Sequence, residues 1–323
     1  MKPIQTGKLI AAACMLAVST GVAAAWPEQP IRLTVGFPAG TGPDIVARTV
    51  GERLSKELGQ PVVIENKAGA GGQIAAHSVV NAAPNGYTIL LGEVGSISIS
   101  PETTSELSYK PLRDLAPITE AVRADFVLVT PADSPHANLD SFVKAATSHN
   151  DAFNFATFGA GTPGHFGAEL LAEAGKFDIE PIHYRSTGDA VTAIISGQVE
   201  GAFITTAMAS TQVAGGKMKG LAITGAQRSK MLQDIPTFAE SGLPDVNFGA
   251  WFAFFAPAGT ADDVLDTLHQ GIVASLNDEQ VRTTLENAGF AVVGSSRQEL
   301  ADLLVSEQKT WSGVVQRTGF KIN

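Results

Sequence analysis

The sequence is almost free of cysteine. Its 323 residues include only one, Cys14, so no disulfide can form within the chain. Basic residues are also in deficit, with 22 lysines and arginines against 32 aspartates and glutamates. Because this charge repels polyanions, nucleic acid and anionic lipid are disfavoured as partners. A small anionic ligand would have to be held by local geometry, since the overall field opposes it.

The motifs of common enzymes are absent as well. The sequence contains no GxSxG elbow, no HExxH pair and no phosphate loop ending in Lys-Ser/Thr. GAGTPG at 159–164 matches GxGxxG, but it lies in mid-chain and not in the first strand–helix turn. His165 and His183 could meet in space, yet neither has a metal-binding spacing. We expect no catalytic residue, no metal and no cofactor. An enzyme without these motifs stays open as the alternative.

One marked apolar stretch is present, and it lies at the N-terminus. Two lysines precede it, the apolar run covers residues 9–22, and three alanines end at Ala25. This order is typical of a secretory signal peptide. We expect residues 1–25 to be removed, which takes away Cys14 and leaves a periplasmic chain that begins at Trp26. No later stretch is apolar enough to insert into a membrane.

The remainder alternates between strand-like and helix-like segments. Apolar runs typical of buried strands lie at 31–37, 61–65, 87–92, 125–130, 153–158, 182–185, 200–205 and 219–224. Helical periodicity lies at 46–58, 74–83, 138–147, 165–175 and 190–197. This alternation predicts an α/β fold in which helices cover mostly parallel sheets, arranged as two similar lobes.

Three helix-opening patterns mark the C-terminal part. Each has a capping residue followed three positions later by an acidic or amide residue: Thr260 with Asp263, Asn277 with Gln280, and Ser296 with Glu299. We expect a helix to begin at each of them, the last with an apolar face turned to the core.

Glycine-rich turns link several strands to the helices that follow. They read FPAGTGPD from Phe37, KAGAGGQ from Lys67, ATFGAGTPGH from Ala156 and YRSTGDA from Tyr184. The first N–H groups of a helix have no partner within it, so such turns can hold an anion. The carboxyl ends of parallel strands share one edge, where ligands bind in open α/β sheets. In the first turn we interpret Asp44 as a brace for the backbone.

In their order, these motifs resemble those of the solute receptors of tripartite tricarboxylate transporters, the Bug family of periplasmic binding proteins. The resemblance covers essentially the whole mature chain. It rests on WPEQPIRLTVGFPAGTGPDIVAR, VVIENKAGAGGQIAA, APNGYTILLG, FATFGAGTPGHFGAELL, IHYRSTGDAVTAIISGQVEGAF, GLAITGAQRSKMLQDIPTFAESGLP and WFAFFAPAGTADDV.

The resemblance implies a two-lobed type II periplasmic binding protein, a monomer that closes over a small carboxylate and delivers it to a membrane permease. Lobe one would comprise residues 26–124 and 251–323, and lobe two residues 125–250. Strands crossing near residues 125 and 250 would form the hinge. Ligands across the family include di- and tricarboxylates, acidic amino acids and aromatic acids, so the resemblance names no single ligand. A secreted or periplasmic enzyme acting on a small carboxylate stays open as the alternative.

The resemblance also implies the ligand-binding residues. They are Ala39, Gly40, Thr41, Gly42, Asp44, Glu93, Thr157, Gly159, Gly161, Thr162, His165, Tyr184, Arg185, Ser186 and Thr205. The glycines at 40 and 42 are expected to let the backbone approach the ligand or to adopt angles that a side chain forbids. The threonines at 41, 157 and 162 are expected to donate hydroxyl hydrogen bonds. Arg185 is the one cation near a predicted site turn.

Three positions depart from the family pattern. Thr41 separates two glycines where many relatives have consecutive ones. Glu93 stands where small polar residues are usual, and Ile204 to Thr206 lie where an acidic or amide residue is common. We expect these positions to influence ligand choice.

Overall fold

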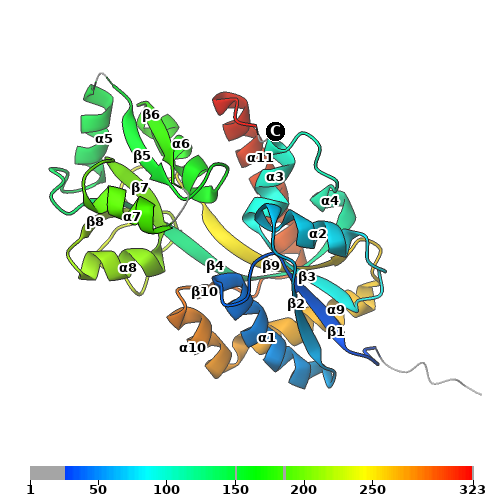
Figure 1. The fold of residues 1–323 in the computed structure, drawn as a ribbon. Helices are drawn as coiled ribbons and strands as arrows, with labels where there is room; N and C mark the ends of the chain where they lie inside the picture. The colour runs from blue at the N-terminus through cyan, green and yellow to red at the C-terminus, as the bar shows by residue number, and fades with distance from the viewer. Residues whose placement is uncertain (1–25, 150, 185–186, 322–323) are drawn as a thin grey trace, which may run out of the picture.

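The computed structural model describes residues 26–149, 151–184 and 187–321. The expected signal peptide, residues 1–25, and the expected site residues Arg185 and Ser186 lie outside the described residues. The chain forms two lobes, each built on a mostly parallel sheet with helices packed against it, and two long strands run between them (Figure 1). The predicted two-lobed α/β fold is confirmed.

The first lobe is built on three parallel strands. These are β1 (Ile31–Val35), β2 (Val62–Asn66) and β3 (Thr88–Glu93). Its N-terminal helical segments are α1 (Gly42–Leu58), η1 (Ala70–Gly72), α2 (Gln73–Val80), η2 (Gly95–Ile99), α3 (Ser100–Thr103) and α4 (Pro111–Asp114). In α1, Val46, Val50 and Leu54 recur every fourth position and are fully buried. Gly59, with φ of +66°, ends the helix.

The second lobe repeats this plan. Its parallel strands are β5 (Phe153–Thr157), β6 (Ile179–His183) and β7 (Gly201–Thr205). Its helices are α5 (Leu139–Ser148), α6 (Pro163–Gly175), α7 (Thr187–Ile195) and α8 (Thr206–Ala214), and β8 (Met218–Ile223) follows them. Phe155 and Phe203 lie at the centre of this sheet and are almost fully buried.

The two lobes share one continuous sheet. The antiparallel strands β4 (Leu115–Pro131) and β9 (Gly249–Pro257) lie between them, in the order β2-β1-β3-β9-β4-β7-β5-β6. β9 pairs with β3 and with the first part of β4, whereas the last part of β4 pairs with β7 and β8. The strand predicted at 125–130 is thus the second half of β4. The exact limits of each lobe stay a prediction.

The C-terminal segment returns along the hinge. It contains α9 (Asp262–Asn277), α10 (Glu279–Asn287), β10 (Ala291–Val292) and α11 (Arg297–Thr318). α11 begins at the predicted capping box of Ser296 and Glu299 and buries Leu300, Trp311 and Val314, as expected. Its Trp311 ring lies 5.9 Å from that of Phe166 in α6, between ring centroids, so α11 also touches the second lobe.

Two predicted helix starts are wrong. The hydroxyl of Thr260 donates to the Pro257 carbonyl at 2.8 Å, and α9 begins after Ala261 without a side-chain cap. Asn277 is the last residue of α9, and Asp278 caps α10 instead. The Asp278 carboxylate is the cap because it accepts hydrogen bonds from two N–H groups of α10 at once. Over the described residues, no helix has the length and apolarity to cross a membrane.

Candidate functional site

The carboxyl ends of the parallel strands in the two lobes approach the same stretch of the hinge. Glu93, the last residue of β3, pairs with Phe252 of β9. Thr205, the last residue of β7, pairs with Phe126 of β4. Phe252 in turn pairs with Val122, which lies on β4 shortly before Phe126. The turns that follow the strands of both lobes therefore open toward one region, the edge at which α/β sheets bind ligands.

The turn between β1 and α1 is held by a side chain of its own helix. Gly40 has φ of +82°, in the left-handed region that favours glycine. Its N–H donates to Asp44 Oδ2 at 2.8 Å. Thr41 precedes the helix, but its hydroxyl donates to the Pro38 carbonyl at 2.7 Å and does not cap α1. Ala39 and Gly40 are exposed, so solvent reaches this part of the turn, whereas Pro43 and Asp44 at the start of α1 are buried.

Asp44 braces the turn from inside. Its side chain is 3 % exposed, and it accepts hydrogen bonds from Arg48 Nε at 2.8 Å and Asn66 Nδ2 at 2.9 Å. The Arg48 guanidinium, with the donors Gly40 and Asn66, lowers the pKa of Asp44 to about 2 against the opposing effect of burial. The carboxylate is therefore ionised and fully occupied. The bracing role expected for Asp44 is confirmed, whereas its contact with a ligand stays a prediction.

Gly42 serves a different purpose from Gly40. It does not have a positive φ, and a Cβ at this position would lie 3.1 Å from Cζ of Phe290. A Cβ on Gly40 would meet nothing within 4 Å. Of the two reasons expected for a glycine here, an unusual backbone angle does not apply to Gly42, which lies close to an aromatic ring instead. Its role in admitting a ligand stays a prediction.

The turn between β5 and α6 repeats the brace with a histidine. Gly159 and Gly161 have φ of +117° and +75°. The N–H of Gly161 donates to Nδ1 of His165 at 3.1 Å, with the same spacing as in the first lobe. Because an N–H can only donate, Nδ1 must carry no proton. Burial, and then the nearby His183, lower the pKa of His165 to about 4, so its ring is neutral at pH 7.

Two threonines predicted to be hydroxyl donors are already hydrogen-bonded in the second lobe. Thr162 donates to the carbonyl of Gly159 at 2.8 Å, and as the N-cap of α6 it accepts from His165 N at 3.4 Å. Thr157 is fully buried, and its hydroxyl lies 2.7 Å from Nδ1 of His183. These hydroxyls shape the turn, and their direct contact with a ligand stays a prediction.

The residue that follows β6 is hydrogen-bonded to the end of β5. The N–H of Tyr184 donates to the Thr157 carbonyl at 3.1 Å. His165 and His183 do meet, with ring centroids 4.8 Å apart. Nε2 of His165 lies 3.9 Å from Glu169 Oε1, which is too far for a hydrogen bond. Across the described ranges, no three His, Cys, Asp or Glu side chains gather as a metal ion would require. Each histidine is instead hydrogen-bonded to the β5–α6 turn, His165 to the Gly161 N–H and His183 to the Thr157 hydroxyl.

The carboxylate of Glu93 accepts hydrogen bonds from the first N–H groups of a helical segment. Its two oxygens accept from Gly95 N and Ser96 N, both at 2.7 Å. These N–H groups open the π-helical segment η2, which the sequence analysis did not predict. Burial raises the pKa of Glu93 to about 7. A Cβ on Gly72 would lie 3.6 Å from its Oε1, so Glu93 also lies against the turn before α2. Whether Glu93 touches a ligand stays a prediction.

An apolar cavity of about 250 Å³ adjoins the turn of the second lobe. It lies where α6 and α8 begin, and it is lined by Phe126, Phe158, Thr162, Pro163, Gly164, Phe203, Ile204, Thr205 and Met208. Thr162, Ile204 and Thr205 were singled out from the sequence, and Phe158 lies within the predicted turn that begins at Ala156. Phe126, Phe203 and Met208 were not expected at the site. Met208 lies in α8, a helix that was not predicted.

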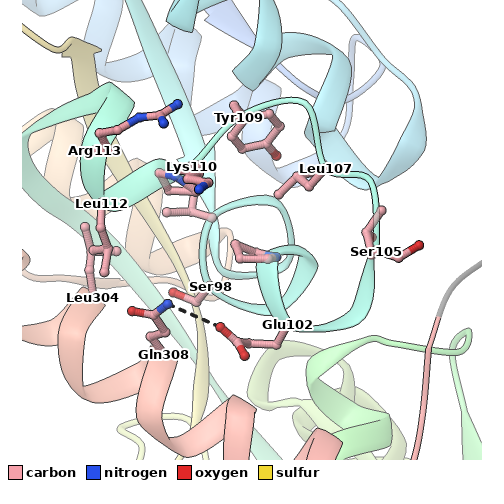
Figure 2. A pocket seen from close by; sticks show the side chains of 14 residues that line it. Ser98, Glu102, Ser105, Leu107, Tyr109, Lys110, Leu112, Arg113, Leu304 and Gln308 are labelled. Carbon is pink, nitrogen blue, oxygen red and sulfur yellow. Dashed lines mark hydrogen bonds between the residues drawn. The ribbon is translucent and has the colours of Figure 1, made fainter.

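A larger cavity, of about 470 Å³, lies in the first lobe. Figure 2 shows its wall, formed by the segment 97–113 and by Leu304 and Gln308 of α11. Nε2 of Gln308 donates to Glu102 Oε1 at 3.3 Å. None of the predicted ligand-binding residues lines this cavity. We therefore assign the candidate site to the facing turns and the apolar cavity beside them, in spite of the smaller volume there.

Comparison with known proteins finds a family whose model matches most of the chain. The sequence model described as tripartite tricarboxylate transporter family receptor matches residues 46–320. The chain is similar to protein BugT of Bordetella pertussis, with 29 % identity over 98 % of each chain. It is similar to the structure of MatC from Rhodopseudomonas palustris with bound malate, with 32 % identity, a TM-score of 0.73, and 90 % of this chain and 100 % of that one covered.

A second R. palustris protein, solved with adipate, is 26 % identical, with a TM-score of 0.76 over 92 % of this chain and 99 % of that one. The similarity thus extends over both lobes and over the turns that face each other. The family is one of substrate-binding receptors and not of enzymes. Family model, relatives and fold agree: the chain belongs to the tripartite tricarboxylate transporter family of periplasmic receptors, as its motifs predicted.

Proposed function

We propose that this protein is a periplasmic receptor that binds a small carboxylate between its lobes, closes over it and delivers it to the permease of a tripartite tricarboxylate transporter. One observation carries the proposal: each lobe offers a glycine turn that is braced by its own helix, through Gly40 and Asp44 in one and Gly161 and His165 in the other. A braced turn is already ordered before the ligand arrives, so less entropy is lost on binding.

The same braces argue for binding without catalysis. Asp44 is ionised and holds three donors, and Nδ1 of His165 holds a backbone N–H. Neither group is left free to take a proton from a ligand in the way a general base must. MatC and its R. palustris neighbour were solved with malate and adipate, two dicarboxylates, which supports a carboxylate as the ligand class here.

A thermal-shift screen against a library of carboxylates tests the proposal. A ligand that binds only the folded protein raises the melting temperature, and calorimetric titration then gives its affinity. Matched amides of the same acids serve as the control, since they lack the charge. If no carboxylate shifts the melting temperature of the folded protein, the proposal fails. Mass spectrometry of the recovered acid separates a receptor from an enzyme, because only a receptor returns it unchanged.

Closure has its own measurement. β4 and β9 are the two hinge strands, and Trp251 of β9 is buried, with its Nε1 donating to Glu307 Oε2 at 2.8 Å. We expect small-angle scattering to show a smaller radius of gyration once the screened ligand saturates the protein. An unchanged radius would indicate a rigid cleft and would remove closure from the proposal.

In the alternative mode of anion binding, the ligand carboxylate pairs with the charge of Arg185 and not with backbone donors. We expect Arg185→Ala to weaken binding no more than the loss of one buried neutral donor does, which is about 1–3 kcal/mol. Calorimetric titration of Arg185→Ala beside Thr162→Val compares the two. A collapse of binding in Arg185→Ala alone would show that the charge pair dominates.

A further inference from the structure

We infer that the ligand carries an apolar body, such as an aromatic ring or a short aliphatic chain, and that the cavity between the starts of α6 and α8 receives it. The inference rests on the proposed carboxylate-binding function and names the chemical class within it.

The lining of the cavity carries the inference. Apart from the hydroxyls of Thr162 and Thr205, its side chains are aromatic or aliphatic, including Phe158, Phe203 and Met208. A second carboxylate or hydroxyl pushed into this space would lose its hydration without gaining comparable partners. A cavity of about 150 Å³ with such walls accepts benzene. The present volume of about 250 Å³ therefore suits one substituted ring or a chain of comparable size.

The cavity adjoins the braced turn of the second lobe. Thr162, Pro163 and Gly164 form the start of α6 and also line the cavity. The braced Gly161 lies one residue before them. A Cβ on Gly164 would lie 3.3 Å from the Phe203 carbonyl oxygen, so this glycine lets α6 sit close to β7. A ligand whose polar end reaches this turn would thus place its next atoms in the cavity.

The first lobe points to a ligand of low charge. Glu93 already occupies Gly95 N and Ser96 N, which would otherwise be the donors of a third turn. A second carboxylate of a ligand could not bind these two N–H groups, because the Glu93 oxygens already accept from them. Neither lobe therefore offers a second anion site as open as the uncapped start of α1.

Calorimetric titration of the wild-type protein with acetate, butyrate, hexanoate, benzoate, succinate and citrate tests the inference. Each methylene that enters the cavity is expected to raise affinity about fourfold, so hexanoate should bind roughly fifteenfold more tightly than butyrate. Benzoate should exceed acetate by a larger factor, and citrate should be the weakest. If succinate or citrate binds more tightly than all the apolar acids, the inference is overturned while the proposed function stands. If none of the six acids binds the folded protein, both fail.

Substitutions at Met208 locate the effect. Met208→Glu should weaken hexanoate and benzoate at least tenfold by placing a charge in the cavity, and the nearly isosteric Met208→Gln should weaken them less. Met231→Glu is the matched control, because Met231 is 45 % exposed and does not line the cavity. If Met208→Glu does not fold, Met208→Gln keeps the test. Unchanged affinities in a folded Met208 variant, or an equal loss in Met231→Glu, would overturn the inference.

Discussion

The two lobes hold corresponding turns by different chemistry. In the first lobe the N–H of Gly40 is held by an ionised carboxylate, Asp44, which is itself paired with Arg48. In the second the N–H of Gly161 is held by the neutral ring of His165. Both acceptors lie four residues after the glycine, on the first turn of the following helix. Both turns therefore require a hydrogen-bond acceptor at that spacing, and the acceptor does not have to be charged.

The helices that follow these turns also differ, because only the helix of the second lobe has a side-chain cap. Thr162 caps α6 with its side chain, whereas Thr41 turns its hydroxyl to Pro38 and leaves α1 uncapped. The first lobe thus combines a charged brace with an open helix start, and the second combines a neutral brace with a closed start and an apolar cavity. The helix start without a side-chain cap therefore belongs to the first lobe, and the apolar cavity belongs to the second.

The largest effect is expected from the charged brace. Asp44→Asn leaves one oxygen for three donors and removes the charge that pairs with Arg48. We expect a loss of about 2–3 kcal/mol in the free energy of unfolding, since hydrogen bonds to charged groups are the stronger ones. Urea unfolding at pH 7 measures it. His165→Phe, which keeps a ring but no acceptor, should lose about 1–2 kcal/mol. An equal or larger loss in His165→Phe would contradict the ranking of the two braces.

The second-largest effect is expected on acidification, because the two braces should lose their contributions to stability at different pH. The folded-state pKa of His165 is lowered to about 4 from an ordinary value of 6.5, so its contribution is complete above pH 6.5 and is lost as the pH falls toward 4. The loss should approach about 1.4 kcal/mol per pH unit within that window. The contribution of Asp44, with a pKa of about 2, persists through the same range and is lost only below its ordinary value of 3.8.

The measurement is the difference in unfolding free energy between the wild type and His165→Phe at pH 7, 6 and 5. Glu93 acts in the opposite direction, because its raised pKa makes the folded state gain a proton as the pH falls. It is present in both proteins, so its effect cancels in the difference. A difference that does not shrink between pH 7 and 5 would show that His165 is not the acid-sensitive group.

Much of the fold could be predicted from the sequence because its strands are short apolar runs separated by glycine turns. The expected strand segments all correspond to strands of the two lobes. The failures have local causes. α8 carries little amphipathic pattern, so Thr206–Ala214 gave no periodic signal. The cap of α10 was misplaced by one residue because Asn277 and Asp278 are both good capping residues, and the sequence does not show which of them accepts from the N–H groups of the helix.

The site was predicted less completely, because turns show which residues are present but not which way they face. The position of Asp44 in the first turn of a predicted helix indicated a brace, and the structure has one. The parallel role of His165 was missed, since nothing in a sequence fixes the tautomer of a ring or its burial. The apolar cavity was missed because its lining residues come from separate parts of the chain. Phe126, Phe158 and Met208 are far apart in the chain and meet only through the packing of β4, β5 and α8.

A smaller effect is expected from the two glycines of the first turn. Gly40→Ala forces a side chain into a conformation with φ of +82° and should cost about 1 kcal/mol. Gly42→Ala needs only a small movement of Phe290 and should change stability by less than about 0.5 kcal/mol, because a less flexible unfolded chain offsets the contact. Thermal unfolding of both variants checks the order. A greater loss in Gly42→Ala would show that contact with Phe290 constrains the turn more than the backbone angle does.

The smallest difference should separate the two threonines. Thr162→Val removes the side-chain cap of α6 and should lower the free energy of unfolding by about 1 kcal/mol. Thr41→Val removes only a hydrogen bond to the Pro38 carbonyl at an exposed position, where water replaces the donor, and should cost about 0.5 kcal/mol or less. Urea unfolding resolves the two if the slope m is the same in both variants, so that the midpoints can be compared directly. Valine matches threonine in shape, which keeps packing out of the comparison. Equal losses would mean that Thr41 caps α1 in solution, and the open helix start that distinguishes the first lobe from the second would disappear.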